Sequence, residues 1–149
     1  MAQIATYEEW EKSVPELMKA DSLWQMQVYR KALFLGDLAW FDLQKLNQQR
    51  WLWSLSDQLY RATGSISANL AEGYSKGTGK DRARFYEYAL GSARESRDWY
   101  FKARHVLGDD VFSHRLTMQT EIIRLLLTMI PQQRQGTLRE ETTDYEVEE

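Results

Sequence analysis

The sequence has no cysteine among its 149 residues. This absence excludes disulfide bonds, thiolate catalysis and cysteine-ligated zinc, and it makes an intracellular location the default expectation. Proline and glycine are also scarce, with two and eight residues, while 43% of the chain is hydrophobic and 28% is charged. Such a composition is globular rather than disordered, and the length suits one domain with a single core.

Long apolar runs are absent as well. The longest, Ala32–Leu35 and Leu38–Phe41, are far shorter than the roughly 20 residues that a membrane span needs. The first ten residues contain no basic stretch followed by an apolar one, so they do not form a signal peptide. We therefore expect a soluble, cytoplasmic protein with no membrane partner.

Negative charge is gathered at the C-terminal end. The chain has a net charge of −3, but residues 140–149 hold six acidic side chains and no basic one, which leaves the rest at +3. A mildly basic body permits contact with nucleic acid without requiring it. Six tryptophans and eight tyrosines are many for this length, and aromatic residues fill both cores and subunit interfaces.

Hydrophobic spacing of three and four residues dominates the chain, and no sustained alternation typical of strands is present. Four stretches follow this helical spacing: 23–46, 52–73, 85–106 and 116–130. We expect an all-α protein, an up-and-down four-helix bundle. The predicted parts are a short helical N-terminal arm (1–21), the bundle (22–131) and an acidic tail (132–149) that is disordered after the helix ends at Pro131.

Several residues mark the expected helix ends. Capping boxes are predicted at Thr6-x-x-Glu9 and Ser13-x-x-Glu16, and Thr78-x-x-Asp81 opens the third long helix. Gly73 suits a left-handed C-cap, and Gly108-Asp109-Asp110 a turn followed by an N-cap. Gly36 would allow a break with a new start at Asp37, but we favour one long helix to about Leu46. The arm is expected to pack on the bundle through Tyr7 and Trp10.

The seams that face other helices are also predicted. In the second long helix the seam comprises Leu52, Leu55, Leu59, Ala62, Ile66, Asn69 and Gly73. In the third it comprises Phe85, Tyr88 or Ala89, Ser92, Ser96, Trp99, Ala103 and Val106.

The segment Gln58–Gly73 is the most distinctive part of the chain. Arg61, Ser65, Asn69 and Glu72 are three or four residues apart, so they fall near one helix face, among small residues that allow close helix approach. A second segment, 85–96, combines an aromatic anchor with Gly91, Ser92 and Glu95. We interpret both as close helix packing and register control.

These two segments resemble the four-helix-bundle family of the 23S rRNA intervening-sequence proteins. The family hallmark reads approximately Gln-x-x-Arg-Ala-x-x-Ser-Ile-x-x-Asn-Ile-Ala-Glu-Gly, followed by Phe-Tyr-x-x-Ala-x-Gly-Ser-x-x-Glu. The resemblance covers roughly residues 50–130, with leucine where the family usually has isoleucine. The matching residues are Gln58, Arg61, Ala62, Ser65, Ile66, Asn69, Ala71, Glu72, Gly73, Phe85, Tyr86, Ala89, Gly91, Ser92 and Glu95.

The resemblance implies a four-helix bundle that assembles into a ring-shaped homo-oligomer, typically a pentamer. It implies no settled activity. A more distant resemblance is to the accessory protein of diversity-generating retroelements, a basic pentameric barrel that binds a reverse transcriptase and nucleic acid. The acidic tail and the N-terminal extension of this chain depart from that pattern.

Two interpretations stay open for the polar motif residues. Asn69 is either a functional polar group or a buried amide that fixes helix register, and the second is favoured. Arg61, Glu72 and Glu95 are expected to form an ion-pair cluster between the second and third long helices, structural rather than catalytic.

No enzyme active site, metal or cofactor is expected. Di-iron bundles need Glu-x-x-His, but Lys102 and Val111 stand three residues before His105 and His114. The loop 76–80 lacks the spacing and the preceding strand of a phosphate-binding loop. No serine is tied to a histidine by a recognisable pattern.

Basic residues gather in the loop before the third long helix and along it. With Tyr74, Tyr86 and Tyr100 they could form a phosphate-binding and stacking surface, although a solvated helix face with ion pairs explains them about as well. The predicted nucleic-acid contacts are Lys76, Lys80, Arg82, Arg84, Arg94 and Arg97; Lys102 and Arg104 belong to the same run.

Two functions are therefore expected, the first in preference to the second. The first is a non-enzymatic oligomeric scaffold or adaptor that binds RNA, DNA or a nucleic-acid enzyme through the basic helix. The alternative is a protein-binding module that uses exposed aromatics such as Trp51 and Trp53, with no nucleic-acid role.

Overall fold

The computed structural model describes the backbone of residues 6–147 and the side chains as far as residue 135, and over this range every regular element is helical. The all-α prediction is confirmed. The elements are α1 (Tyr7–Ser13), α2 (Glu16–Lys19), the 3-10 turn η1 (Ser22–Gln25), α3 (Gln27–Leu46), the 3-10 turn η2 (Arg50–Leu52), α4 (Trp53–Tyr74), α5 (Gly79–Leu107) and α6 (Asp109–Val147).

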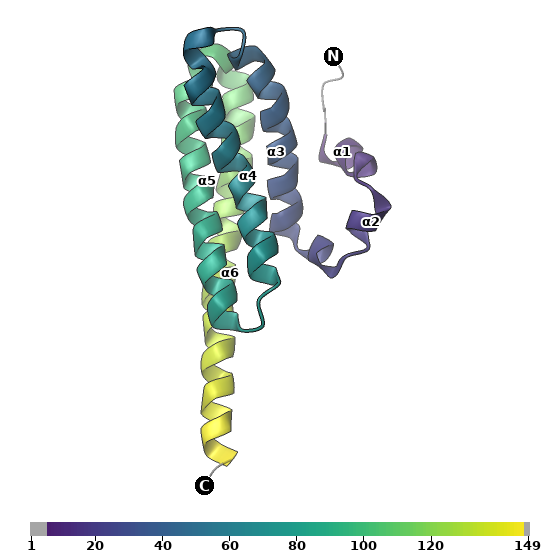
Figure 1. The fold of residues 1–149 in the computed structure, drawn as a ribbon, viewed down its shortest axis with the longest axis vertical. Helices are drawn as coiled ribbons and strands as arrows, with labels where there is room; N and C mark the ends of the chain where they lie inside the picture. The colour runs from purple at the N-terminus through teal and green to yellow at the C-terminus, as the bar shows by residue number, and fades with distance from the viewer. Residues whose placement is uncertain (1–5, 148–149) are drawn as a thin grey trace.

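The four long helices, α3 to α6, lie side by side (Figure 1). α5 packs most extensively, against α4 on one side and α6 on the other, and α3 packs against α4 and less closely against α6. α3 is one continuous helix through Gly36, as favoured. No described helix is both long and apolar enough to span a bilayer.

Two glycines are required where the long helices meet. Gly108 alone separates α5 from α6, with a φ of 90° that L side chains rarely adopt, and the predicted turn is confirmed. Gly73 does not form the predicted left-handed C-cap, because α4 continues through it to Tyr74. Instead, a Cβ at Gly73 would lie 2.8 Å from the Cβ of Phe85, so glycine there permits the close approach of α4 and α5.

The predicted seam of α4 agrees with the structure. Leu52, Leu59, Ala62 and Ile66 are buried, and Leu55 is partly buried against the same core. The stripe of α5 is partly confirmed: Ala89, Ser96 and Ala103 are buried, and Trp99 and Val106 pack partly buried against the core. At several positions the fully buried residue is the next one along, namely Tyr86, Ala93, Tyr100 and Leu107. Tyr86 and Tyr100 are therefore core residues, and they contribute nothing to a stacking surface.

The N-terminal arm, here α1, α2 and η1, lies beside α3 (Figure 1), and Tyr74 of α4 donates to Ser22 of η1 at 2.8 Å. Thr6 caps α1 by accepting from the Glu9 amide at 3.2 Å, as predicted. The second capping box is wrong: Pro15 stands at the N-cap of α2, and the Ser13 hydroxyl donates to the Trp10 carbonyl instead. Trp10 is buried, and Tyr7 packs on its ring.

The predicted end of the last helix is wrong. α6 continues through Pro131 to Val147, so residues 132–147 are helical rather than disordered, while 148 and 149 lie outside the described residues. Pro131 removes a single backbone donor from an exposed position, and strong helix formers such as Gln132, Gln133 and Arg134 follow it. This extension projects past the loop that joins α4 and α5 (Figure 1).

Candidate functional site

The polar motif residues meet on the outside of the α4–α5 pair. The Ser65 hydroxyl contacts the Ser92 hydroxyl across the two helices, so the structure brings the two motif segments together. Asn69, one turn from Ser65, donates to the Ser65 carbonyl at 2.8 Å. It is half-buried and bonded within its own helix, so the predicted register-fixing amide between helices is not formed.

The predicted ion-pair cluster does not form among the described residues. Arg61 is exposed and pairs with Asp57 of its own helix at 3.1 Å. Glu95 accepts from the indole nitrogen of Trp99 at 3.2 Å, and Glu72 is exposed. The charged members of the motif therefore point outward rather than between helices. We call Arg61, Ser65, Asn69, Glu72, Ser92 and Glu95 the motif seam.

An apolar and small-residue strip runs along α4 beside the motif seam. Trp53, Tyr60, Gly64 and Ala68 are all exposed, and the ring of Tyr60 lies edge-on to Trp40 of α3, with centroids 5.9 Å apart. Trp40 is 53% exposed, Trp53 54% and Tyr60 40%. Nothing lies within 4 Å of a Cβ built on Gly64. We call these five residues the α4 outer face.

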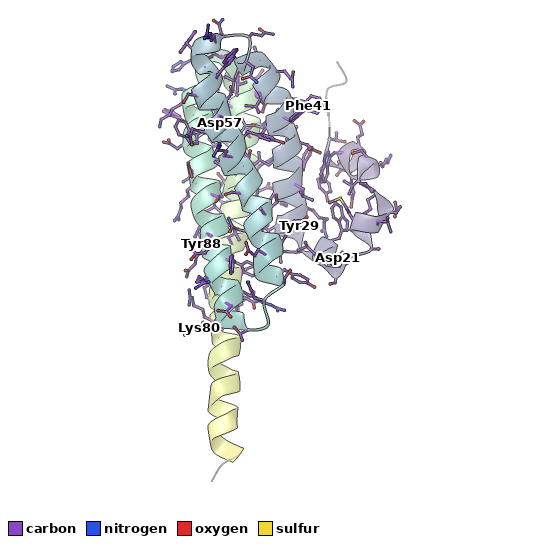
Figure 2. All side chains as sticks on the ribbon, in the orientation of Figure 1. Asp21, Tyr29, Phe41, Asp57, Lys80 and Tyr88 are labelled. Atoms are coloured by element: carbon purple, nitrogen blue, oxygen red, sulfur yellow. The ribbon has the colours of Figure 1, made fainter. Side chains whose placement is uncertain are left out.

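The predicted nucleic-acid residues separate into two groups. Lys76, Lys80, Arg82 and Arg84 gather where α4 joins α5, and we call them the cationic end; Figure 2 shows Lys80 at the foot of α5. Arg94 and Arg97 lie farther along α5, about 15 Å or more from Arg84 at 1.5 Å per residue. The six residues therefore do not form one continuous patch.

Aromatic rings lie under the cations of this end. The charged groups of Lys76 and Arg84 lie 4.9 and 5.4 Å from the ring centre of Phe85, and Tyr88 meets that ring edge-on at 5.5 Å. Arg82 covers Tyr74 and donates to the Lys76 carbonyl at 2.9 Å, so it also orders the loop. Each such cation–aromatic contact is worth about 0.5–1 kcal/mol when exposed.

A buried polar cluster that the sequence did not reveal lies inside the bundle. Asp42 of α3 accepts from the Tyr100 hydroxyl at 2.6 Å and from Arg115 of α6 through both carboxylate oxygens, at 2.8 and 3.0 Å. Burial, together with the Asp42 charge, raises the pKa of Tyr100 well above its usual value. Burial alone would lower the pKa of Arg115, but the bonds to Asp42 outweigh it and raise that pKa.

A second buried contact joins two of these three helices, α5 and α6. Gln119 of α6 donates to the Ser96 hydroxyl of α5 at 3.1 Å. The sequence could have pointed to this buried cluster through polar side chains that interrupt an apolar stripe. Asp42 follows Leu35 and Ala39 at helical spacing, and Gln119 precedes Ile122 and Leu126 in the same way. These bonds hold helices of one chain together, so we assign them a structural role.

The histidine and acidic side chains of the described residues are the groups that could bind a metal ion or transfer protons. The described part of the chain contains no group of three or more histidine and acidic side chains close enough to hold a metal ion. His105 and His114 are both exposed, and His114 contacts Arg115, whose charge adds to burial in lowering the His114 pKa.

Comparison with known proteins assigns the family. The model of the 23S rRNA-intervening sequence protein family matches residues 25–128, which is most of the chain. The chain belongs to this family. Among solved structures, it is similar to a protein of unknown function of the S23 ribosomal protein family from Bacteroides thetaiotaomicron, with a TM-score of 0.65 and 23% identity, covering 69% of this chain and 97% of that one. No match is found among curated proteins.

The N-terminal arm lies outside the family match. The family match begins at residue 25, so α1, α2 and nearly all of η1 precede it. The similar solved structure shares the fold and, at this identity, supports nothing finer.

Proposed function

We propose that this protein is a non-enzymatic helical scaffold that self-associates through the α4 outer face. Its four long helices form an up-and-down bundle, and copies of that bundle assemble into a closed ring. A pentamer is the stoichiometry expected from the family resemblance, and the cytoplasm is the expected location.

The observation that supports this proposal is the composition of the α4 outer face. Three large aromatic side chains remain half-exposed, although the core of the chain is already filled with other aromatic and aliphatic residues. Two of them, Trp40 and Tyr60, are in contact, and Tyr60 lies one turn from Gly64. Exposed apolar surface of this kind marks an interaction site, and tryptophan and tyrosine are the residues that interfaces favour. Small residues four apart let a second helix approach closely, because no side chain holds it away.

Gly64→Arg tests this proposal without burdening the fold, because the position is open to solvent and arginine is the better helix former. We expect the closed oligomer of the wild-type chain to be lost from a native mass spectrum and to be replaced by smaller species, down to the single chain of 17.6 kDa. Thr117→Arg, at an exposed position of α6, is the matched control and should leave the oligomer intact. An unchanged oligomer in the Gly64 variant contradicts the proposed interface.

A second candidate function is nucleic-acid binding at the cationic end. It is favoured by the pair of cations over the half-buried Phe85 and by the exposed Tyr88, since single-stranded nucleic acids bind through phosphate contacts and stacking. The Glu87–Arg134 pair of α5 and α6 adds no net charge nearby. A nucleic-acid enzyme as partner remains part of this candidate.

Charge reversal measures that candidate directly. A chain with Lys80→Glu and Arg84→Glu should bind a fluorescent single-stranded RNA at least tenfold more weakly than wild type at 50 mM salt, with a smaller salt dependence. Arg124→Glu, on α6, is the control. Equal binding by all three chains, or none by the wild type at low salt, favours the scaffold acting on protein partners alone, with Trp51 and Trp53 among the exposed aromatics available.

A further inference from the structure

The arm is held on α3 by its own cluster of side chains. Trp10 of α1 and Trp24 of η1 are buried, at 4% and 7% exposure, against Phe34 and Leu38 of α3. The ring of Trp10 lies 5.2 Å from that of Phe34 and stacks on that of Trp24 at 6.2 Å. The buried members of this cluster differ from those of the main core, although Tyr29 and Met118 pack against both. The Tyr74 hydroxyl of α4 also donates to Ser22 of η1 at 2.8 Å. The arm therefore docks on the outside of the bundle, mainly on α3.

α3 recognises the arm through polar contacts as well. The indole nitrogen of Trp10 donates to the Asp37 carboxylate at 2.6 Å, and Arg30 donates to the Trp24 carbonyl at 2.5 Å. A bond to a charged acceptor is about twice as strong as a neutral one, and it also fixes the orientation of the ring. α3 therefore presents one acceptor, one donor and an apolar floor at helical spacing: Arg30, Phe34, Asp37 and Leu38. We call these four residues the α3 docking face.

The connection between the arm and α3 is short and contains no helix. Met26 is extended between η1 and α3, with φ −76° and ψ 107°. Figure 2 shows Asp21 of the arm and Tyr29 of α3 near each other, beside the lower end of α3 and this connection. An element that packs through its own cluster and joins by a short extended segment can make the same contacts on another copy, which is the geometry of domain swapping.

We propose that the α3 docking face is a binding site for a tryptophan-anchored helix, and that its partner in trans is the arm of a second copy of this chain. Trp10 is the anchor, and Asp37 with Phe34 provides the specificity. The exposed Leu17 of α2, at 89%, takes no part in recognition. This interaction is independent of the α4 outer face, and arms exchanged in this way would link copies on a second side.

A labelled peptide of residues 6–25 tests the site. The receptor is the full chain with Trp10→Ala, which weakens the contact of its own arm with the α3 docking face. Its helical content by circular dichroism establishes that it is folded. We expect saturable binding by fluorescence anisotropy, and weaker apparent binding to the wild-type chain, whose own arm competes. Tyr7→Ala, which removes a different arm contact, is a second receptor if Trp10→Ala impairs folding.

Two changes separate recognition from nonspecific adhesion. Trp10→Ala in the peptide, or Asp37→Ala in the receptor, should weaken binding by about tenfold or more, because each removes one partner of the charged hydrogen bond. Leu17→Ala in the peptide should leave it unchanged. No binding to a folded receptor, or binding indifferent to Trp10 and Asp37, overturns the proposal. Gly64→Arg tests the α4 outer face separately, so failure of one proposal does not imply failure of the other.

Discussion

At the scale of single residues, Asp42 is a carboxylate buried inside the bundle. Its carboxylate is 8% exposed and holds both Tyr100 and Arg115. A buried pair of this kind adds little net stability over apolar residues of the same volume, because desolvation offsets the attraction. Removing one partner strongly destabilises the fold, since the remaining charge stays buried without a partner.

Arg115→Met should therefore lower the free energy of unfolding by about 3–5 kcal/mol, measured by urea denaturation. The double variant Asp42→Asn with Arg115→Met should recover much of that loss, because no unpaired charge remains. Arg124→Met, at an exposed position of the same helix, is the control and should change stability by less than about 0.5 kcal/mol. Equal losses in the single and double variants would contradict the buried ion pair.

Tyr100 should make the fold sensitive to alkali. Its pKa is raised in the folded chain, so above the unfolded value of about 10 the unfolded chain loses a proton that the folded chain keeps. Stability is therefore complete below pH 10 and falls as the pH rises above it. Tyr100→Phe should reduce the slope of unfolding free energy between pH 9.5 and 11, relative to wild type. An identical slope would remove Tyr100 as the cause.

Two glycines of α4 should respond in opposite directions to alanine. Gly73→Ala places a Cβ 2.8 Å from Phe85 and should cost about 1–3 kcal/mol, as overpacking does. Gly64→Ala meets nothing within 4 Å and should stabilise the folded chain by about 1 kcal/mol through helix propensity. Thermal unfolding of the two variants compares them directly, and destabilisation of both would contradict the role assigned to Gly73.

At the scale of helices, the sequence predicted α4 better than α5 for a physical reason. The seam of α4 contains large aliphatic residues such as Leu59 and Ile66 at helical spacing, so only one register buries them. In α5, aromatic residues occur side by side, as Phe85 and Tyr86 and again as Trp99 and Tyr100, so spacing alone fits either register. The choice is made by a partner 58 residues away, the Asp42 carboxylate, which local pattern does not contain.

The same reasoning covers the candidate sites. The gathering of Lys76, Lys80, Arg82 and Arg84 could be predicted because they are close in sequence, whereas the α4 outer face could not. Its exposure depends on which helices flank α4, and the contact of Tyr60 with Trp40 joins two helices. The charged motif residues were wrongly expected between helices. Their spacing shows that they share one helix face, but it does not show whether that face packs against another helix or lies in solvent.

Pro131 tests the continuity of α6. Proline in a helix removes one backbone hydrogen bond, so Pro131→Ala should raise the free energy of unfolding, by at most about 3 kcal/mol. Helical content by circular dichroism should stay the same, because the structure is already helical on both sides of this residue. A large gain of helix on substitution would instead show that α6 ends near Pro131 in the wild-type chain.

At the scale of the whole molecule, the chain combines a filled core with several surfaces that a single copy leaves open. The α4 outer face and the cationic end lie on the bundle, whereas the arm covers part of α3 and the end of α6 projects beyond the loop between α4 and α5 (Figure 1). The family match covers the bundle and leaves the arm outside it. We therefore place the proposed self-association on the bundle and the proposed exchange between copies on the arm.

The mass of the native wild-type protein tests the central proposal most directly. A native mass spectrum recorded at micromolar concentration, before and after nuclease treatment, reports the number of copies together with any bound nucleic acid. Self-association predicts one closed homo-oligomer at a multiple of 17.6 kDa, unchanged by nuclease. A single chain as the only species under both conditions would contradict it.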